Sequence, residues 1–279
     1  MLKDITLGQY FPGNSIIHRL DPRTKLIMLV VYIVALFMAT GWSAYAVLFA
    51  ALVWVIQVST IPVKSIIKGM KPLVVILIFT GLLNLFLTQE GKLLVDFWVI
   101  TIYSGGVSRA AMMVARILML ITCTFLLTYT TSPIALTDGL EALMNPLKKV
   151  GVPVHELSMM MCIALRFIPT LIEETDKIMC AQKARGADFE NGSLMVRAKA
   201  LIPILVPLFI SAFRRADELA TAMECRCYQG GEGRTKMKLL RYHREDFIAF
   251  GLGAGLIFAV VMLANLGMCG KSCAILLCF

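Results

Sequence analysis

The chain has 279 residues, of which 58% are hydrophobic and 16% are charged, and its formal net charge is +9. Soluble domains usually carry about 25% charged residues. The composition therefore excludes a disordered chain and a disulfide-stapled mini-domain, and it argues against an ordinary soluble enzyme. Because the chain is so apolar, the important question about its excess of basic residues is which loops contain them, since their distribution sets the orientation of a membrane protein.

Five long apolar stretches predict membrane spans. Crossing about 30 Å of hydrocarbon takes roughly 20 helical residues, with a range near 17–25. The first three stretches are short by this measure, but uncharged polar residues on their flanks extend them. The five stretches are 26–40, 44–58, 73–88, 110–129 and 247–268.

A sixth apolar run, residues 200–213, is predicted not to span. It has 14 residues, is interrupted by Pro203 and Pro207, and is flanked by basic side chains on both sides. That length is typical of a buried or interfacial helix.

The distribution of basic residues predicts the orientation in the membrane. With five spans, the N-terminus, the 59–71 loop and the 133–246 segment lie on one side and hold 23 of the 27 Lys and Arg residues. The positive-inside rule makes this side cytoplasmic. We therefore expect a multi-pass protein of the cell membrane with a cytoplasmic N-terminus and an outside C-terminus.

The 133–246 segment contains 16 basic and 14 acidic residues, so it is charged but nearly neutral. A short helix is expected to begin at Ser132-Pro133 and to end near Lys148. Two long helices follow, over about 154–185 and 193–227. Each would be about 45 Å long at 1.5 Å per residue, which is too long for a compact core and fits an amphipathic pair at a membrane surface.

These elements define an all-α polytopic fold, with five membrane helices and a cytoplasmic module of three helices. The expected organisation is residues 1–132 with the first four spans, residues 133–246 as the cytoplasmic module, and residues 247–279 with the fifth span.

Both long helices end alike, with one arginine in the last turn. The two tripeptides are Ala184-Arg185-Gly186 and Cys225-Arg226-Cys227. One interpretation is a cation that satisfies the negative end of the helix dipole, worth about 0.3–1 kcal/mol. The alternative is a pair of guanidinium groups presented to acidic grooves on a partner, where the planar fork of Arg pairs with a carboxylate better than Lys does.

At these motifs the sequence resembles the transmembrane (T) component of energy-coupling factor (ECF) transporters, the ATP-driven importers of vitamins and metal ions. The likeness covers nearly the whole chain and looks most like the shared type, which serves several substrate-binding subunits. Its most specific parts are residues 8–10, 18–25, 184–186 and 225–227. The family commonly has small residues such as Ala and Gly around the second arginine, where this chain has Cys225 and Cys227.

The resemblance implies a coupling subunit without catalysis or a cofactor of its own, with ATP bound by partner subunits. It implies that Arg185 and Arg226 each dock into one of two cytoplasmic ATPases, and that the long helices cradle a small membrane-embedded substrate-binding (S) subunit. The N-terminal motif Asp21-Pro22-Arg23 also has a structural interpretation, because Asp as N-cap and Pro in the first turn start a helix. A family-specific role for Arg23 is the alternative.

Other chemistry has little support in the sequence. Residues 267–272 imitate a phosphate-binding loop but lack its first glycine and the strand before it. The cysteines form no C-x-x-C pair and the three histidines are scattered, so we expect no metal site, and no nucleic-acid partner. Cys269, Cys273 and Cys278 fall on the predicted outer side, where a disulfide could form.

A self-sufficient secondary transporter, or another polytopic permease, is the alternative function. Such proteins need acidic residues or histidine at membrane depth, and no acidic residue lies in the five stretches. Arg116 is the only charged residue within them, and it could extend to the outer interface or mark a functional site. We expect Asn84, Thr122, Thr124 and Thr128 to donate hydrogen bonds between helices, and Glu173 and Glu174 to be solvated charges.

Overall fold

The computed structural model describes residues 10–87, 93–97, 100–187, 189, 194–231 and 240–276. The chain divides into two compact units. We call residues 8–139 with 240–279 the span unit, and residues 140–239 the helix-pair unit.

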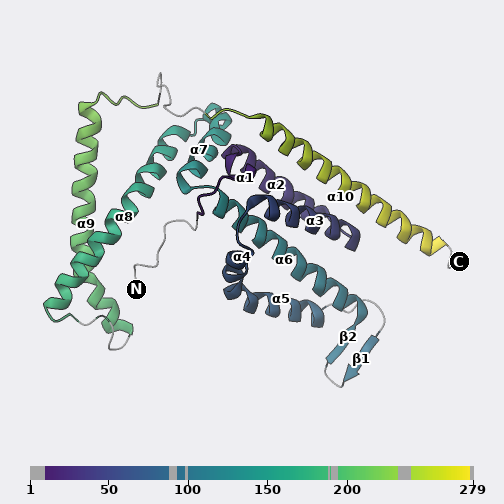
Figure 1. Cartoon of the computed structure of the whole chain (residues 1–279). Helices are drawn as coiled ribbons and strands as arrows, with labels where there is room; N and C mark the ends of the chain where they lie inside the picture. The colour runs from purple at the N-terminus through teal and green to yellow at the C-terminus, as the bar shows by residue number, and fades with distance from the viewer. Residues whose placement is uncertain are drawn as a thin grey trace. The chain divides into compact units, whose positions relative to one another are not determined.

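The core of the span unit lies between four of its helices, α2, α3, α6 and α10, which pack against one another (Figure 1). Tyr32, Leu36, Leu48, Met119 and Val260 are buried there. The helices of this unit are α1 (Ile16–Arg19), α2 (Pro22–Met38), α3 (Trp42–Ser59), α4 (Val63–Met70), α5 (Val74–Leu87), α6 (Ser104–Thr130), most of α7 (Pro133–Met144), and α10 (Arg244–Leu276).

Helix α4 was not predicted, since residues 59–71 were expected to form a loop. Its apolar residues recur at helical spacing and bury Ile66 in a second cluster with Ile61, Leu126 and Tyr129. The three lysines of the segment conceal this short pattern in the sequence. A short 3-10 turn, Lys71–Leu73, joins α4 to α5.

A small β-hairpin adds to the helical fold between α5 and α6. Strands β1 (Leu93–Phe97) and β2 (Ile100–Tyr103) pair antiparallel. Residues 89–109 were predicted as a loop, so neither strand was foreseen. Helix α6 begins at Ser104, six residues before the predicted start of that span at 110. Apart from this hairpin, the regular elements of the described residues are helices, which confirms the predicted fold class.

Among the described residues, five helical segments are long and apolar enough to cross a membrane, the number predicted. Four of them match predicted spans: α3, residues 63–86, α6 and α10. The fifth is α8 (Val154–Ala184), whereas α2, predicted as the first span, has 17 residues and is not in this set. That length is the lower end of the range for a span.

Arg116 lies between helices of the span unit rather than extending alone. Its guanidinium lies over the rings of Phe37 and Tyr45, at 5.5 and 5.8 Å from their centroids, and Nη2 donates to the carbonyl of Ala39, the C-cap of α2, at 3.4 Å. Arg116 therefore joins α6 to the end of α2 and the start of α3.

The expectation that polar side chains of the spans bond between helices was wrong for Asn84, Thr124 and Thr128, whereas Thr122 of α6 does reach a neighbouring helix. All four side chains donate to the carbonyl four residues earlier in their own helix, at 2.7–3.1 Å. Hydroxyl and amide groups in an apolar helix find this partner locally, so they do not need a neighbouring helix. Thr122 has one further contact, with the sulfur of Met70 on the α4 side at 3.9 Å.

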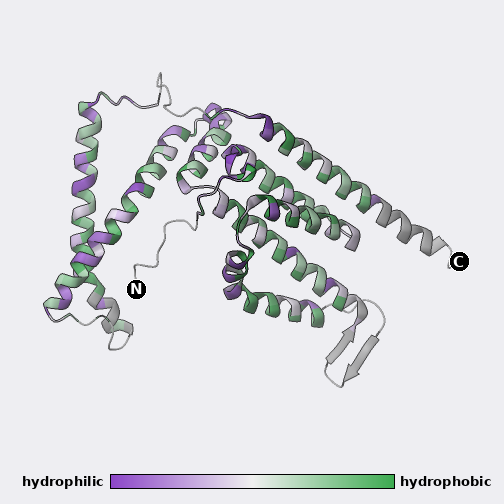
Figure 2. Cartoon of the chain, in the orientation of Figure 1, coloured by the Kyte–Doolittle hydropathy of each residue, from purple (hydrophilic) through white to green (hydrophobic). Residues whose placement is uncertain are grey.

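The helix-pair unit is built on two long helices that cross each other, α8 (Val154–Ala184) and α9 (Leu194–Cys225) (Figure 1). A 3-10 segment, Asn145–Val150, leads into α8 after the short helix predicted from Ser132-Pro133. Ser132 caps that short helix by accepting from the backbone N–H of Ala135. Figure 2 shows hydrophilic residues recurring along α8 and α9, whereas α10 beyond its first turn is mostly apolar.

An ion pair and hydrogen bond fasten α8 to α9. Glu174 accepts from Arg215 Nη2 at 2.6 Å and from the hydroxyl of Ser211. These contacts correct the expectation that Glu174 is a solvated charge, because its side chain faces the partner helix. Gln182 further donates to the carbonyl of Pro203 at 3.4 Å.

Candidate coupling site

The first arginine motif ends α8 in a Schellman turn. Arg185 is the C-cap, and Gly186 follows with a φ of +87°, a left-handed conformation that glycine adopts without a steric penalty. The N–H of Gly186 donates to Lys183 and that of Ala187 to Gln182, both at 3.0 Å. The arginine side chain is exposed at this turn.

The second motif ends α9 in the same way. The N–H of Cys227 donates to the carbonyl of Glu224 at 2.9 Å, and that of Tyr228 donates to Met223 at 3.1 Å. Arg226 again occupies the position before the left-handed residue. Here that residue is Cys227, with a φ of +57°, where the first motif has glycine.

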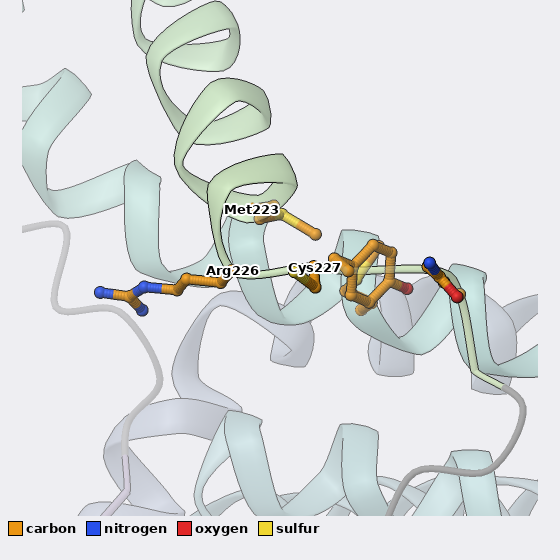
Figure 3. A pocket seen from close by; sticks show the side chains of 7 residues that line it. Met223, Arg226 and Cys227 are labelled. Carbon is orange, nitrogen blue, oxygen red and sulfur yellow. The ribbon is translucent and has the colours of Figure 1, made fainter.

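A pocket of about 380 Å³ lies beside Arg226. In Figure 3 the Arg226 side chain extends away from Met223 and Cys227, which lie on the other side of the turn. Met159, near the start of α8, also lines the pocket. The end of α9 therefore lies close to the beginning of α8.

The two arginines consequently occupy opposite ends of the helix pair. Glu174 meets Arg215 and Gln182 meets Pro203, so residue numbers fall along α9 as they rise along α8 and the helices run antiparallel. From Met159 to Arg185 is 26 residues, or roughly 40 Å along a helix. One partner groove could not accept both side chains.

The helix pair also exposes large apolar side chains. An exposed contiguous apolar surface marks a site that another protein or a membrane covers. On α8 the exposed residues include Leu157, Met160 and Met161. On α9 they are Met195, Leu201, Ile202, Leu205, Val206, Phe209, Ile210 and Phe213.

The N-terminal motif caps α2 as predicted. The Asp21 carboxylate accepts from the N–H of Arg23 at 3.0 Å, and Pro22 is in the first turn. The structure shows two further contacts of this motif that were not predicted from the sequence. Asp246 Oδ1 accepts from the N–H of Asp21 at 3.0 Å, and the guanidinium of Arg23 lies 5.8 Å from the centroid of the Tyr242 ring.

The segment before this motif is organised by His18. Nε2 lies 3.0 Å from the carbonyl of Phe11 and Nδ1 lies 2.6 Å from the Ser15 hydroxyl, which fits a neutral ring that donates from Nε2 and accepts at Nδ1. Partial burial lowers the pKa of His18 below its ordinary value, although the Phe11 carbonyl opposes this shift. The neutral form therefore holds the segment together.

Among the described residues, no group of three or more His, Cys, Asp or Glu side chains could hold a metal ion. Residues 267–272, which imitate a phosphate-binding loop, are part of α10 and so form no loop. The predicted disulfide candidates Cys269, Cys273 and Cys278 lie outside the residues whose side chains are described.

These features define a class: a multi-pass helical membrane protein with a long, charged helix pair. A family model described as cobalt transport protein (CbiQ) matches residues 13–237. The chain belongs to the family of transmembrane (T) components of ECF transporters, as its curated relatives also show.

Three of these relatives are each named "Energy-coupling factor transporter transmembrane protein EcfT". The protein of Thermosediminibacter oceani is 53% identical over 92% of this chain and 96% of its own length. That of Ruminiclostridium cellulolyticum is 51% identical over 90% and 94%, and that of Bacillus subtilis is 49% identical over 88% and 93%. The chain is thus a component of a multi-subunit transporter, and not a self-sufficient permease.

Proposed function

We propose that this chain couples two cytoplasmic ATPases to a membrane-embedded S subunit, through Arg185 and Arg226. The observation that carries the proposal is the pair of matching helix ends. Each offers one exposed guanidinium from the same backbone turn, and the two ends lie roughly 40 Å apart along α8. Two such ends suit two separate acidic grooves, one on each ATPase.

The exposed apolar side chains of α8 and α9 are the proposed seat of the S subunit. They lie between the two arginine-bearing ends, so movement of either end would displace this surface. The S subunit would bind the vitamin or metal micronutrient, and in a shared transporter several S subunits would use the same surface in turn. The chain itself would bind no ATP and catalyse no reaction.

The same proposal fixes the orientation. We place the N-terminus and residues 133–246 in the cytoplasm and the C-terminus outside, because 23 of 27 basic residues then lie inside. Helix α8 belongs to the cytoplasmic side in this arrangement, although its length and apolar residues would allow it to span. It carries charged residues along its length, from Glu156 and Arg166 to Lys183.

Charge reversal tests the coupling role. In the Arg185→Glu/Arg226→Glu double variant, we expect loss of ATPase co-purification and loss of ATP-driven uptake, since a carboxylate would face the acidic grooves. Each single variant should keep one ATPase contact and lose most uptake. Arg214→Glu, at an exposed position within α9, is the charge-matched control and should retain both the complex and uptake.

The outcome against the proposal is a double variant that still purifies with both ATPases and still drives uptake. A second comparison separates charge from shape. Arg→Lys at both positions keeps the charge but removes the planar fork, so assembly should weaken without being abolished.

A further inference from the structure

A single buried carboxylate joins the starts of two helices that are far apart in sequence. Asp246 is fully buried. Its Oδ2 accepts from the N–H of His243, the residue before α10, at 2.7 Å, and its Oδ1 accepts from the N–H of Asp21, the N-cap of α2, at 3.0 Å. The first bond is one half of a capping box. The second bond fixes α10 to α2, 225 residues away.

Helix α7 also packs against the start of α2. A Cβ added at Gly139 would lie 2.9 Å from Pro22 Cβ and 3.2 Å from the Pro22 carbonyl carbon. Contacts below 3.0 Å require a shift, and the carbonyl carbon cannot move as a side-chain tip does. Gly139 thus allows α7 to pack directly on the backbone that starts α2.

Arg23 adds a third connection, through its position over the ring of Tyr242. The start of α2 therefore contacts both α7 and residues 242–246. We call Asp21, Pro22, Arg23, Gly139, Tyr242 and Asp246 the clasp. All of its members belong to the span unit.

The chain leaves the span unit after Gly139 and returns to it at Leu240. The first boundary falls within α7, which continues to Met144, so the clasp holds this helix and residues 242–246, which follow the return of the chain at Leu240. A satisfied buried carboxylate and a glycine-sized contact leave little room for α7 or the start of α10 to shift against α2. The clasp is thus placed to keep α7 and the start of α10 fixed on the start of α2.

We propose that the clasp is the anchor against which the helix-pair unit moves during ATP hydrolysis. This inference rests on the proposed function and names the residues that keep the movement of α8 and α9 out of the membrane helices. Asp21, Gly139 and Asp246 are then positioning residues. Loosening any of them would let the movement dissipate into α2 and α10.

Hydrogen exchange of the purified complex with its ATPases tests this role, with ATP and vanadate as the probe. In the wild type we expect nucleotide to change exchange in α8 and α9 and to leave residues 16–30 and 240–250 unchanged. In Gly139→Ala and Asp246→Asn, exchange in these two segments should become nucleotide-dependent, at least 5-fold faster with nucleotide than without. A purely structural role would raise exchange equally with and without nucleotide.

Gly255→Ala is the matched control, because no atom lies within 4 Å of a Cβ at that position in α10, and it should behave as the wild type. If Asp246→Asn fails to fold, Tyr242→Leu, which removes the contact with Arg23, carries the test with Gly139→Ala. The anchor is refuted if the variants show no nucleotide dependence in these segments, or if the wild type already shows it. A wild-type chain that binds no ATPase refutes the proposed function itself, and the anchor role with it.

Discussion

Cys227 adopts a backbone conformation that suits glycine better. The corresponding residue at the end of α8 is Gly186, and both have positive φ. For a residue with a Cβ, the left-handed conformation costs roughly 1–2 kcal/mol. The second arginine is therefore presented from a turn that is more strained than the first.

We expect Cys227→Gly to raise the free energy of unfolding by about 1 kcal/mol, since glycine removes the steric cost but loses more chain entropy. Thermal unfolding of the purified chain in detergent would measure it. Cys225→Gly is the matched control with the opposite sign, because Cys225 is the last residue of α9 and glycine lowers helix stability by about 0.5–1 kcal/mol. Equal effects of the two substitutions would contradict this account.

Local rules predicted the cap of α2 from its sequence, because Asp21 and Pro22 act on their own neighbours. The partner of that cap could not be predicted in the same way. Asp246 stands three residues after His243 at the start of an apolar run, which is the capping-box spacing. That spacing accounts for the bond to His243, but nothing local indicates that the second oxygen reaches Asp21.

The crossing of α8 and α9 depends on a contact between their polar residues. Glu174 of α8 accepts hydrogen bonds from Arg215 and Ser211 of α9, while much of the apolar surface of both helices stays exposed. Ile204 of α9 is buried as well, so the polar contact acts together with apolar packing at the crossing. Because both charged groups are partly exposed, solvent screens their attraction.

A double-mutant cycle with Glu174→Gln and Arg215→Gln should give a coupling energy of about 0.5–1 kcal/mol. Chemical unfolding of the chain in detergent provides the four free energies. The same cycle with Glu173→Gln in place of Glu174→Gln is the control, because Glu173 is exposed, and it should give no coupling. A coupling of similar size in both cycles would show that the crossing does not depend on this pair.

The sequence predicted the helices of residues 133–227 well, since apolar runs, Ser132 as the cap of α7 and Gly186 as the stop after α8 all act locally. The predicted end of the first long helix at 185 and the observed end of α8 at Ala184 differ by one residue. Elements stabilised by their neighbours were missed. Helix α4 is eight residues long and gains its stability by burying Ile66 against α6, and an isolated helix of that length is marginal in water.

Each of the two units keeps its own part of the proposed function. The span unit contains the apolar helices and the clasp, and the helix-pair unit contains both arginine turns. We propose their assignment to the membrane and the cytoplasm from the distribution of basic residues. It needs a test of its own, because α8 is also long and apolar enough to cross.

Reporter fusions test the topology. Alkaline phosphatase, which is active only outside the cytoplasm, should be active when fused after the C-terminal residue and inactive when fused after residue 240, since α10 lies between these sites. A fluorescent protein that matures only in the cytoplasm should give the reverse pattern. Active phosphatase at residue 240 would show that α8 or another helix crosses, and that residues 133–246 are not all cytoplasmic.

The matching turns at the ends of α8 and α9 have a consequence for the proposed ATPase partners. Both arginines leave the same kind of backbone turn, so, if the proposed function holds, the hydrogen bonds of the two turns would not by themselves distinguish one ATPase subunit from the other. Two copies of one ATPase would be served as well as two different ones. Any directionality between them must then arise elsewhere, from the differing lengths of chain that follow the two turns or from the ATPases themselves.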